Sequence, residues 1–348
     1  MEIRMELSKI QQEIVNTNKP YVAVVAAAAA GKTRVLTERV RKMLKDGINP
    51  KDIAVITFTN LAAQELQERL ADDYKPGIYI GTIHGLAAYF LRLNGVDVGE
   101  MADKKEFDEF FEILRSHPNY VRHIPHILLD EAQDTSPNEY EFIFDMISPD
   151  TFFVVGDYRQ AIYSFKGADP ELFDKLIADP GVSVYSLNEN YRNGDKILKF
   201  AKKVLGKKNS VDDSIPMRQG GIVWEGDATL SNLKNWIKET GEYKDWAVLC
   251  TTNKIIQEIC GLLEANGIPT ITFKQGEVTK DQLESNMSSN KVKVLTYHSA
   301  KGLEFPYVAA WKPKNWGGDE TDRVNYVGAT RAKDVLLWMK EKKKSKWF

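Results

Sequence analysis

The sequence has little cysteine and no long hydrophobic run. Cys250 and Cys260 are its only cysteines, too few for a disulfide framework and without the spacing of a metal site. We expect both to be buried small apolar residues in a reducing setting. The longest apolar run, residues 21–30, is about half of what a membrane-spanning helix needs, and residues 1–4 lack a signal peptide's apolar core. These features predict a cytoplasmic protein that is neither secreted nor membrane-bound.

The sequence also lacks a large excess of charge of either sign. Its formal net charge is -2, with 43% hydrophobic and 28% charged residues, which is the balance of a soluble globular protein. Contact with nucleic acid would therefore have to come from a local basic groove. Composition neither supports nor excludes such contact. The 348 residues are enough for two domains of ordinary size.

Short apolar runs recur between amphipathic stretches along the chain. Continuous apolarity is typical of strands that are covered on both faces, so the sequence predicts an α/β fold with parallel sheets. The expected strands cover residues 22–25, 53–56, 127–129, 152–155, 182–185, 247–249, 292–295 and 308–310.

Helices and loops are expected between these strands. Asn60 is predicted to be the N-cap of a helix over residues 61–70. Residues 202–221 are rich in charge and glycine and are expected to form a surface loop, as are residues 276–290. The lysine cluster in residues 340–348 is expected to be a solvated tail, with contact to phosphate as the alternative. A further helix is indicated by apolar side chains at helical spacing, namely Phe107, Phe110, Phe111 and Leu114.

A phosphate-binding loop is predicted between the first expected strand and a helix over residues 34–44. There, Gly31-Lys32-Thr33 would place backbone N–H groups and a helix N-terminus against a polyphosphate. Lys32 would contact the outer phosphates, and the Thr33 hydroxyl would contact magnesium. Alanines fill residues 26–30, where glycine usually allows positive φ, so the loop is either slightly strained or holds them in allowed conformations. The alternative is a buried alanine-rich turn.

Two acidic residues at the end of an apolar strand predict the second half of a nucleotide hydrolysis site. Asp130 is expected to hold the magnesium ion, and Glu131 to orient and deprotonate the attacking water. A later strand runs into Gly156-Asp157, and Gln160 follows as a polar group that could sense the γ-phosphate. The alternative is that the two acids merely cap the start of a helix.

Together, the ordered motifs resemble those of the UvrD/Rep-type superfamily 1 DNA helicases. The resembling segments are residues 7–15, 54–63, 81–84, 130–135, 155–168, 187–192, 295–305 and 326–333. The resemblance implies two tandem RecA-like P-loop NTPase domains with parallel sheets, over residues 1–180 and 181–348, and an ATP site in the cleft between them. It also implies that the accessory domains are reduced to a small helical insertion at about residues 94–125 in the first domain and are absent from the second.

The resemblance further implies roles for individual residues. Gln11 would read the adenine edge, Tyr191 would stack on the adenine, and Glu304 would lie on the ribose side. The nucleotide-binding set is Gln11, Ala28, Ala29, Ala30, Gly31, Lys32, Thr33, Arg34, Tyr191 and Glu304. The catalytic set is Lys32, Glu131, Gln160, Arg192 and Arg331, with both arginines as fingers on the γ-phosphate. The magnesium set is Thr33 and Asp130. The nucleic-acid set is Phe58, Asn60, His84, Tyr163, Phe165 and His298.

Each of these functional roles has a structural alternative. The two arginines could form surface ion pairs, and the aromatic residues, above all Phe58 and Tyr163, could belong to the hydrophobic core. The implied activity is 3′-to-5′ movement on single-stranded or tailed duplex DNA, with ATP and Mg²⁺ as cofactors. Its direction rests on the resemblance alone. A monomer is expected because one chain carries both halves of the ATP site.

Because the accessory domains are reduced, we expect weak unwinding, or a protein partner that supplies strand separation.

Two other classes of function compete with this one. The first is a non-catalytic nucleic-acid-binding module that uses nucleotide only as a ligand, which the alanine-rich loop suggests. The second is a helicase–nuclease, for which the chain leaves no room after residues 326–333.

Overall fold

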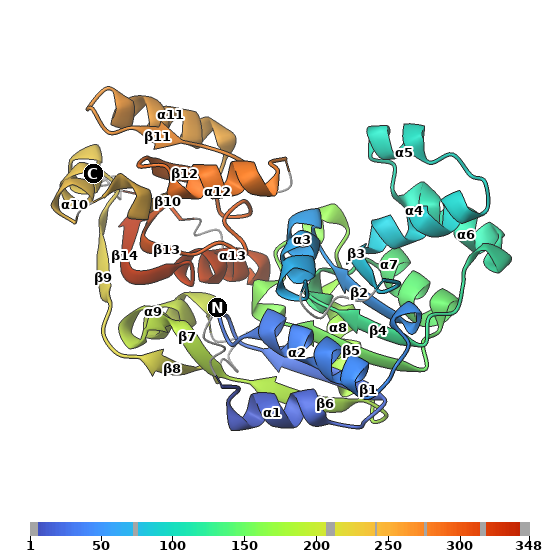
Figure 1. Ribbon diagram of the computed structural model, residues 1–348. Helices are drawn as coiled ribbons and strands as arrows, with labels where there is room; N and C mark the ends of the chain where they lie inside the picture. Colours follow the sequence, from blue (N-terminus) through green and yellow to red (C-terminus); the bar gives the residue numbers. More distant parts are fainter. Residues whose placement is uncertain are drawn as a thin grey trace. The chain divides into compact units, whose positions relative to one another are not determined.

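The computed structural model divides into two compact units (Figure 1). Unit 1 comprises Met1–Ala26 and Ala30–Leu187, and unit 2 comprises Ala27–Ala29 and Asn188–Phe348. The boundary follows Leu187 rather than residue 180, because strand β6 (Ser183–Leu187) pairs with the first sheet. The structure describes residues 6–71, 76–206, 213–240, 242–274, 277–313 and 318–341.

Unit 1 is built on a six-stranded parallel sheet. The strand order is β3-β2-β4-β5-β1-β6, and β2 is buried along its whole length. Because the strands are parallel, their carboxyl ends share one edge, where residues after β1, β2, β4 and β5 gather. The strands are β1 (Tyr21–Ala26), β2 (Ile53–Thr57), β3 (Tyr79–Thr82), β4 (His126–Leu129), β5 (Thr151–Gly156) and β6 (Ser183–Leu187).

Helices flank this sheet, and Figure 1 shows α4, α5 and α6 together on one side of unit 1. The α-helices are α1 (Lys9–Asn16), α2 (Lys32–Lys45), α3 (Asn60–Arg69), α4 (Ile83–Leu93), α5 (Gly99–Lys104), α6 (Asp108–Ser116), α7 (Pro137–Glu141) and α8 (Pro170–Ala178). A π-helix follows α7 over Phe142–Ile147. Short 3₁₀ turns cover Pro50–Asp52, Pro118–Tyr120, Ala132–Asp134, Tyr158–Gln160 and Ser164–Lys166.

Two expectations about these helices have different outcomes. The prediction that Asn60 caps α3 is wrong by one residue. Thr59 is the N-cap, because its extended backbone lets its hydroxyl accept a hydrogen bond from the Ala62 N–H at 3.1 Å. The helix predicted from the phenylalanine spacing is confirmed as α6, which buries Phe110 and Phe111 in the unit 1 core.

Unit 2 contains a second six-stranded parallel sheet, with strand order β11-β12-β10-β13-β14-β9. Its strands are β9 (Ile222–Asp227), β10 (Trp246–Cys250), β11 (Thr270–Ile271), β12 (Val292–Thr296), β13 (Phe305–Trp311) and β14 (Ala332–Lys340). A separate parallel pair is formed by β7 (Glu189–Gly194) and β8 (Ile215–Arg218). The helices are α9 (Asp195–Leu205), α10 (Leu230–Glu239), α11 (Asn253–Glu264), α12 (Lys280–Ser288) and α13 (Asp319–Ala329), with a 3₁₀ turn at Tyr243–Asp245.

The two loops expected in unit 2 are wrong in part. Helix α9 continues to Leu205 because Ala201 and Leu205 are buried, and β8 forms within the same stretch by pairing with β7. Helix α12 occupies most of the second stretch and begins at a capping box made by Thr279 and Gln282. Residues 342–348 of the lysine-rich tail lie outside the described residues. The two sheets confirm the α/β class and two RecA-like domains.

Among the residues that the structure describes, no helix is both long enough and apolar enough to cross a lipid bilayer.

Candidate active site

The predicted phosphate loop connects β1 to α2. Gly31 has φ +86° and directly precedes the first residue of α2, Lys32. Of the alanines, only Ala29 has a positive φ, at +58°, which is a left-handed conformation that costs an L-residue about 1 kcal/mol. Ala28 and Ala30 are each 1% exposed. The loop is therefore strained at one alanine and relaxed at the others.

This local strain predicts opposite effects for two matched substitutions. Ala29→Gly relieves the left-handed backbone, whereas Ala28→Gly only adds freedom to the unfolded chain and removes a buried methyl group. We expect Ala29→Gly to be the more stable variant by about 1–2 kcal/mol. Urea unfolding of the two variants measures this difference. Equal free energies of unfolding would contradict the strain at Ala29.

Gln11 supports the loop from α1. Its side-chain oxygen accepts from the Ser8 N–H at 3.1 Å, and its amide nitrogen donates to the Ala30 carbonyl at 3.2 Å. A Cβ atom at Gly31 would lie 2.9 Å from that amide nitrogen. Position 31 therefore requires glycine for two reasons, its positive φ and its contact with Gln11. The predicted reading of adenine by Gln11 stays a prediction.

Lys32 and Glu131 meet at the carboxyl edge of the unit 1 sheet. The Lys32 Nζ lies 3.1 Å from a Glu131 carboxylate oxygen. Burial opposes the charge on Lys32, but the carboxylates of Glu131, Asp157 and Asp130 outweigh it and raise the pKa of Lys32. Glu131 itself has a left-handed backbone, with φ +54°. Such strain in a residue of this type is typical of functional sites.

A hydrogen-bond network joins Glu131 to the segment after β5. The Gln133 amide donates to Glu131 at 2.5 Å, and its oxygen accepts from the Asp157 N–H at 2.8 Å. Asp157, fully buried, accepts from Gln160 at 2.6 Å and from the Arg159 Nε at 2.6 Å. The structure thus connects Gln160 to Glu131 through two residues, Gln133 and Asp157, that received no role in the sequence analysis.

The chemistry of Thr33 and Asp130 fits a magnesium ion bound together with a nucleotide. Thr33 carries a hydroxyl in the first turn of α2, and Asp130 is a carboxylate with 7% exposure at the end of β4. The described residues contain no group of three or more His, Cys, Asp or Glu that could hold a metal alone. A site that relies on phosphate oxygens and water is typical of Mg²⁺.

Asp130 also predicts a pH dependence of this binding. Burial and the charge of Glu131 raise the pKa of Asp130 to about 7, although Lys32 opposes the shift. Below that pH the carboxyl group is protonated and must lose its proton to bind a cation. We expect magnesium-dependent nucleotide affinity to fall by up to about tenfold per pH unit below about pH 7 and to be flat above it. Titration of a fluorescent ATP analogue measures this, and an equally steep fall in Asp130→Asn would contradict it.

In unit 2, Arg192 and Glu304 form an ion pair. The Arg192 Nε lies 2.7 Å from Glu304, and its Nη1 donates to the Thr330 carbonyl at 3.3 Å. Lys333 pairs with the same carboxylate. Burial opposes ionisation of Glu304, but Arg192 and Lys333 outweigh it and lower the pKa of Glu304. Tyr191 has 43% exposure, so part of its ring could accept a stacked base.

Arg331 lies in the interior of unit 2. It is 1% exposed, and it donates to the carbonyls of Val327 at 3.0 Å and Leu303 at 3.2 Å. Arg331 therefore does not form the surface ion pair that was the alternative to its predicted role. Its predicted role as an arginine finger stays a prediction.

Three of the predicted nucleic-acid residues gather in unit 1. Phe58 and Tyr163 stack with ring centroids 4.9 Å apart, and Tyr163 lies 6.1 Å from Phe165. The Lys166 ammonium lies 4.9 Å from the centre of the Tyr163 ring. Tyr163 is 8% exposed, whereas Phe165 is 63% exposed. Of the three rings, Phe165 is therefore the most exposed to solvent.

The other predicted nucleic-acid residues lie elsewhere. Asn60 is exposed at the start of α3. His84 packs on Phe107 of the short insertion, with ring centroids 4.7 Å apart, and burial lowers its pKa. His298 is half-buried after β12 in unit 2.

Comparison with known proteins identifies the family. The UvrD/REP helicase N-terminal domain matches residues 7–118 and 108–180, and the UvrD-like helicase C-terminal domain matches residues 275–343. The chain belongs to the UvrD/Rep helicase family. The first match contains Lys32, Asp130 and Glu131, and the second contains Arg331.

Similar relatives are DNA helicases. DNA helicase II of Escherichia coli (strain K12) is 25% identical over 365 residues, which cover 75% of this chain and 50% of the relative. ATP-dependent DNA helicase Rep of the same strain is 25% identical, covering 76% and 55%. A probable DNA helicase of Mycoplasma pneumoniae is 23% identical, covering 95% and 82%. The chain spans about half the length of the first two.

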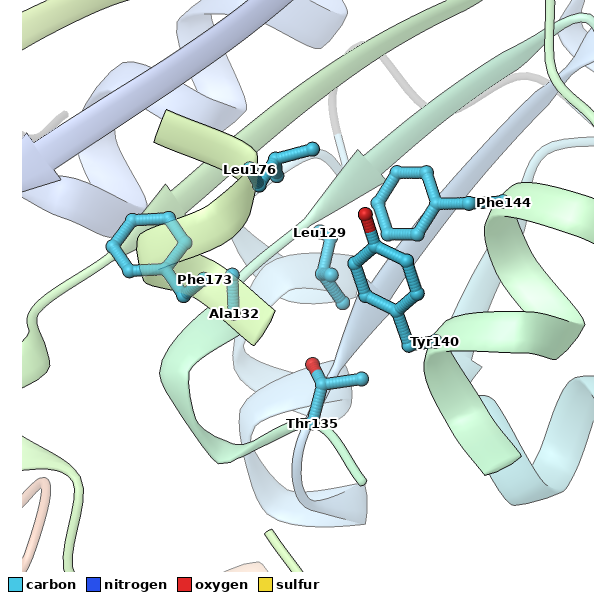
Figure 2. A pocket seen from close by; sticks show the side chains of 7 residues that line it. All are labelled: Leu129, Ala132, Thr135, Tyr140, Phe144, Phe173 and Leu176. Atoms are coloured by element: carbon cyan, nitrogen blue, oxygen red, sulfur yellow. The ribbon is translucent and has the colours of Figure 1, made fainter. Parts of the chain in front are cut away.

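A small cavity in unit 1 is lined by residues that include Leu129 and Ala132 (Figure 2). Its volume is about 10 Å³, roughly the space of one water molecule. Figure 2 shows the Tyr140 and Phe144 rings side by side, and their centroids are 4.5 Å apart. The size and mostly apolar lining identify a packing gap rather than a ligand pocket. The lining residues are Leu129, Ala132, Thr135, Tyr140, Phe144, Phe173 and Leu176.

Proposed function

We propose that this chain is an ATP-dependent DNA helicase or translocase that hydrolyses ATP to ADP and phosphate and moves 3′-to-5′ on single-stranded DNA. The observation that carries the proposal is the pairing of Lys32 with Glu131 at 3.1 Å, beside the buried carboxylate of Asp130. A phosphate-binding cation, a general base and a metal ligand are the groups that phosphoryl transfer to water requires. Family membership supports the same activity.

Nucleotide binding would exchange the partners of the ion pair. The γ-phosphate competes for Lys32, which releases the Glu131 carboxylate to accept a proton from the attacking water. Thr33 and Asp130 would hold magnesium together with ATP, and the ion would supply Lewis-acid polarisation of the phosphates. Gln160 and Asp157 hold the segment after β5 in register with Glu131.

The remaining nucleotide contacts are proposed for residues of unit 2 and α1. Arg192 and Arg331 would stabilise the charge that develops on the γ-phosphate. Tyr191 would stack on the adenine with its exposed ring, and Glu304 would lie beside the ribose. Gln11 would contact the adenine edge from its position against the phosphate loop.

DNA contact is proposed for both units. Phe165 would stack on a base without sequence preference, because every base has a π-face, and Phe58 and Tyr163 support the platform. Asn60, His84 and His298 would contact the strand elsewhere. Strand separation would be weak in the isolated chain or would depend on a protein partner, since α5 and α6 are the only α-helices described in residues 94–125.

Translocation on labelled single strands tests this function and its direction. We expect the protein to reach a fluorophore at the 5′ end after a lag that grows with strand length, and to give no such lag for a fluorophore at the 3′ end. Phe165→Ala should weaken strand binding by about 1–3 kcal/mol, and Tyr89→Ala is the control, because Tyr89 is an exposed aromatic residue in α4. A lag that grows with length only for the fluorophore at the 3′ end would contradict the proposed direction. Binding of DNA without hydrolysis of ATP would favour a nucleic-acid-binding module.

A further inference from the structure

Strand β7 contains an irregularity at Tyr191, Arg192 and Asn193. Its pairing with β8 shifts between Asn190 and Gly194, so the three residues between them leave the regular ladder. Bulges of this kind re-aim side chains and are frequent beside active sites. Asn190 holds the bulge, because its side-chain oxygen accepts from the backbone N–H groups of Arg192 at 3.1 Å and Asn193 at 2.9 Å.

Asn190 also bonds to the phosphate loop. Its amide nitrogen donates to the Ala28 carbonyl at 2.9 Å and to the Asn193 side-chain oxygen at 2.9 Å. The Tyr191 N–H donates to the neighbouring Ala29 carbonyl at 3.3 Å. Asn190 is fully buried, so these bonds are shielded from water. One side chain therefore connects the backbone at Ala28 to the β7 bulge, and these two segments are far apart in the sequence.

Asn193 extends this connection to the segment that carries the second arginine. Its amide nitrogen donates to the Thr330 carbonyl at 3.1 Å and to the Ala332 carbonyl at 2.5 Å, on either side of Arg331. Asn193 is also fully buried. Both hydrogens and the oxygen of each amide are occupied, and a network satisfied in this way fixes a single arrangement of its members.

We infer that Asn190 and Asn193 are positioning residues, which set the backbone of Ala28 and the two arginine-bearing segments of unit 2 in one register. The inference rests on the proposed ATP hydrolysis. Neither amide needs to touch the nucleotide. Asn193 fixes the backbone that carries Arg192 and Arg331, so its loss affects charge stabilisation in the transition state. Asn190 also holds Ala28, so its loss affects nucleotide binding as well.

The test is the kinetics of Asn193→Ala and Asn190→Ala in the full chain, with single-stranded DNA present. We expect Asn193→Ala to lower kcat by about tenfold to a hundredfold while the Kd of a fluorescent ATP analogue changes less than about twofold. Asn190→Ala should lower kcat and also raise that Kd. Asn188→Ala is the matched control, because Asn188 bonds to Asp213 on the exposed side of the same segment. Asn193→Ser, which keeps one hydroxyl donor, replaces Asn193→Ala if that variant does not fold.

A double variant separates positioning from a merely structural role. In the Arg192→Ala background, Asn193→Ala should lower kcat by less than it does alone, because one of the two arginines that it positions is gone. Independent losses of kcat, or a lower melting temperature with unchanged kcat, would overturn the inference while leaving the proposed function intact. Absence of hydrolysis by the wild-type chain would overturn the proposed function and this inference with it.

Discussion

Replacing Arg192 with alanine is expected to lower the kcat of DNA-stimulated ATP hydrolysis by about a thousandfold or more, with a small effect on nucleotide affinity. An arginine that stabilises charge on the transferring phosphoryl group acts mainly in the transition state. Arg192 has a partly exposed partner, Glu304, and its side chain is 13% exposed. Its guanidinium can therefore change partners without opening the core of unit 2.

Arg331→Ala is the informative comparison, because Arg331 is enclosed. We expect it to lower kcat as well, but also to lower the free energy of unfolding by about 1–3 kcal/mol, since the carbonyls of Val327 and Leu303 lose their donor. Steady-state kinetics and urea unfolding of both variants measure the two effects. A kcat within about twofold of wild type for Arg192→Ala would contradict its role as a finger.

Replacing Glu131 with glutamine is expected to lower kcat by about 10²–10⁴-fold while nucleotide binding persists. The amide keeps the size of the side chain and can still accept from Lys32, but it cannot take a proton from water. Glu131 is the carboxylate that both Lys32 and Gln133 contact, at 3.1 and 2.5 Å. The loss of kcat should therefore reflect the missing carboxylate rather than a change in packing.

The matched control is Glu141→Gln. Glu141 lies in α7 of the same unit and bonds to Arg115 from an exposed position. Its replacement should leave kcat unchanged and cost little stability, because exposed ion pairs contribute at most about 1 kcal/mol. Equal kcat values for Glu131→Gln and Glu141→Gln would contradict the role of Glu131 as the general base.

Much of the fold follows from hydrophobic pattern alone. The expected runs in both sheets are strands, because burial on both faces demands continuous apolarity. Strand β7 escapes this reasoning, since its sequence from Glu189 to Gly194 has one large apolar side chain, Tyr191. It becomes a strand only by pairing with β8, and β8 lies in a stretch whose charge and glycine content indicated a loop.

The candidate site likewise has a part that could be predicted from the sequence and a part that could not. Lys32, Asp130 and Glu131 could be predicted because local motifs fix their chemistry relative to a strand end or a helix start. The contacts of Gln133 and Asn193 could not, because their partners lie 24 and more than 130 residues away in the sequence. Neutral amides carry no local signature of such contacts.

Steady-state ATP hydrolysis by the wild-type chain, with and without single-stranded DNA, tests the central claim most directly. We predict a rate that rises by about tenfold or more when DNA is added, and that collapses in Glu131→Gln under both conditions. Nucleotide binding without hydrolysis in either condition would contradict the claim, and would make the strained loop at Ala29 the first place to look for the cause.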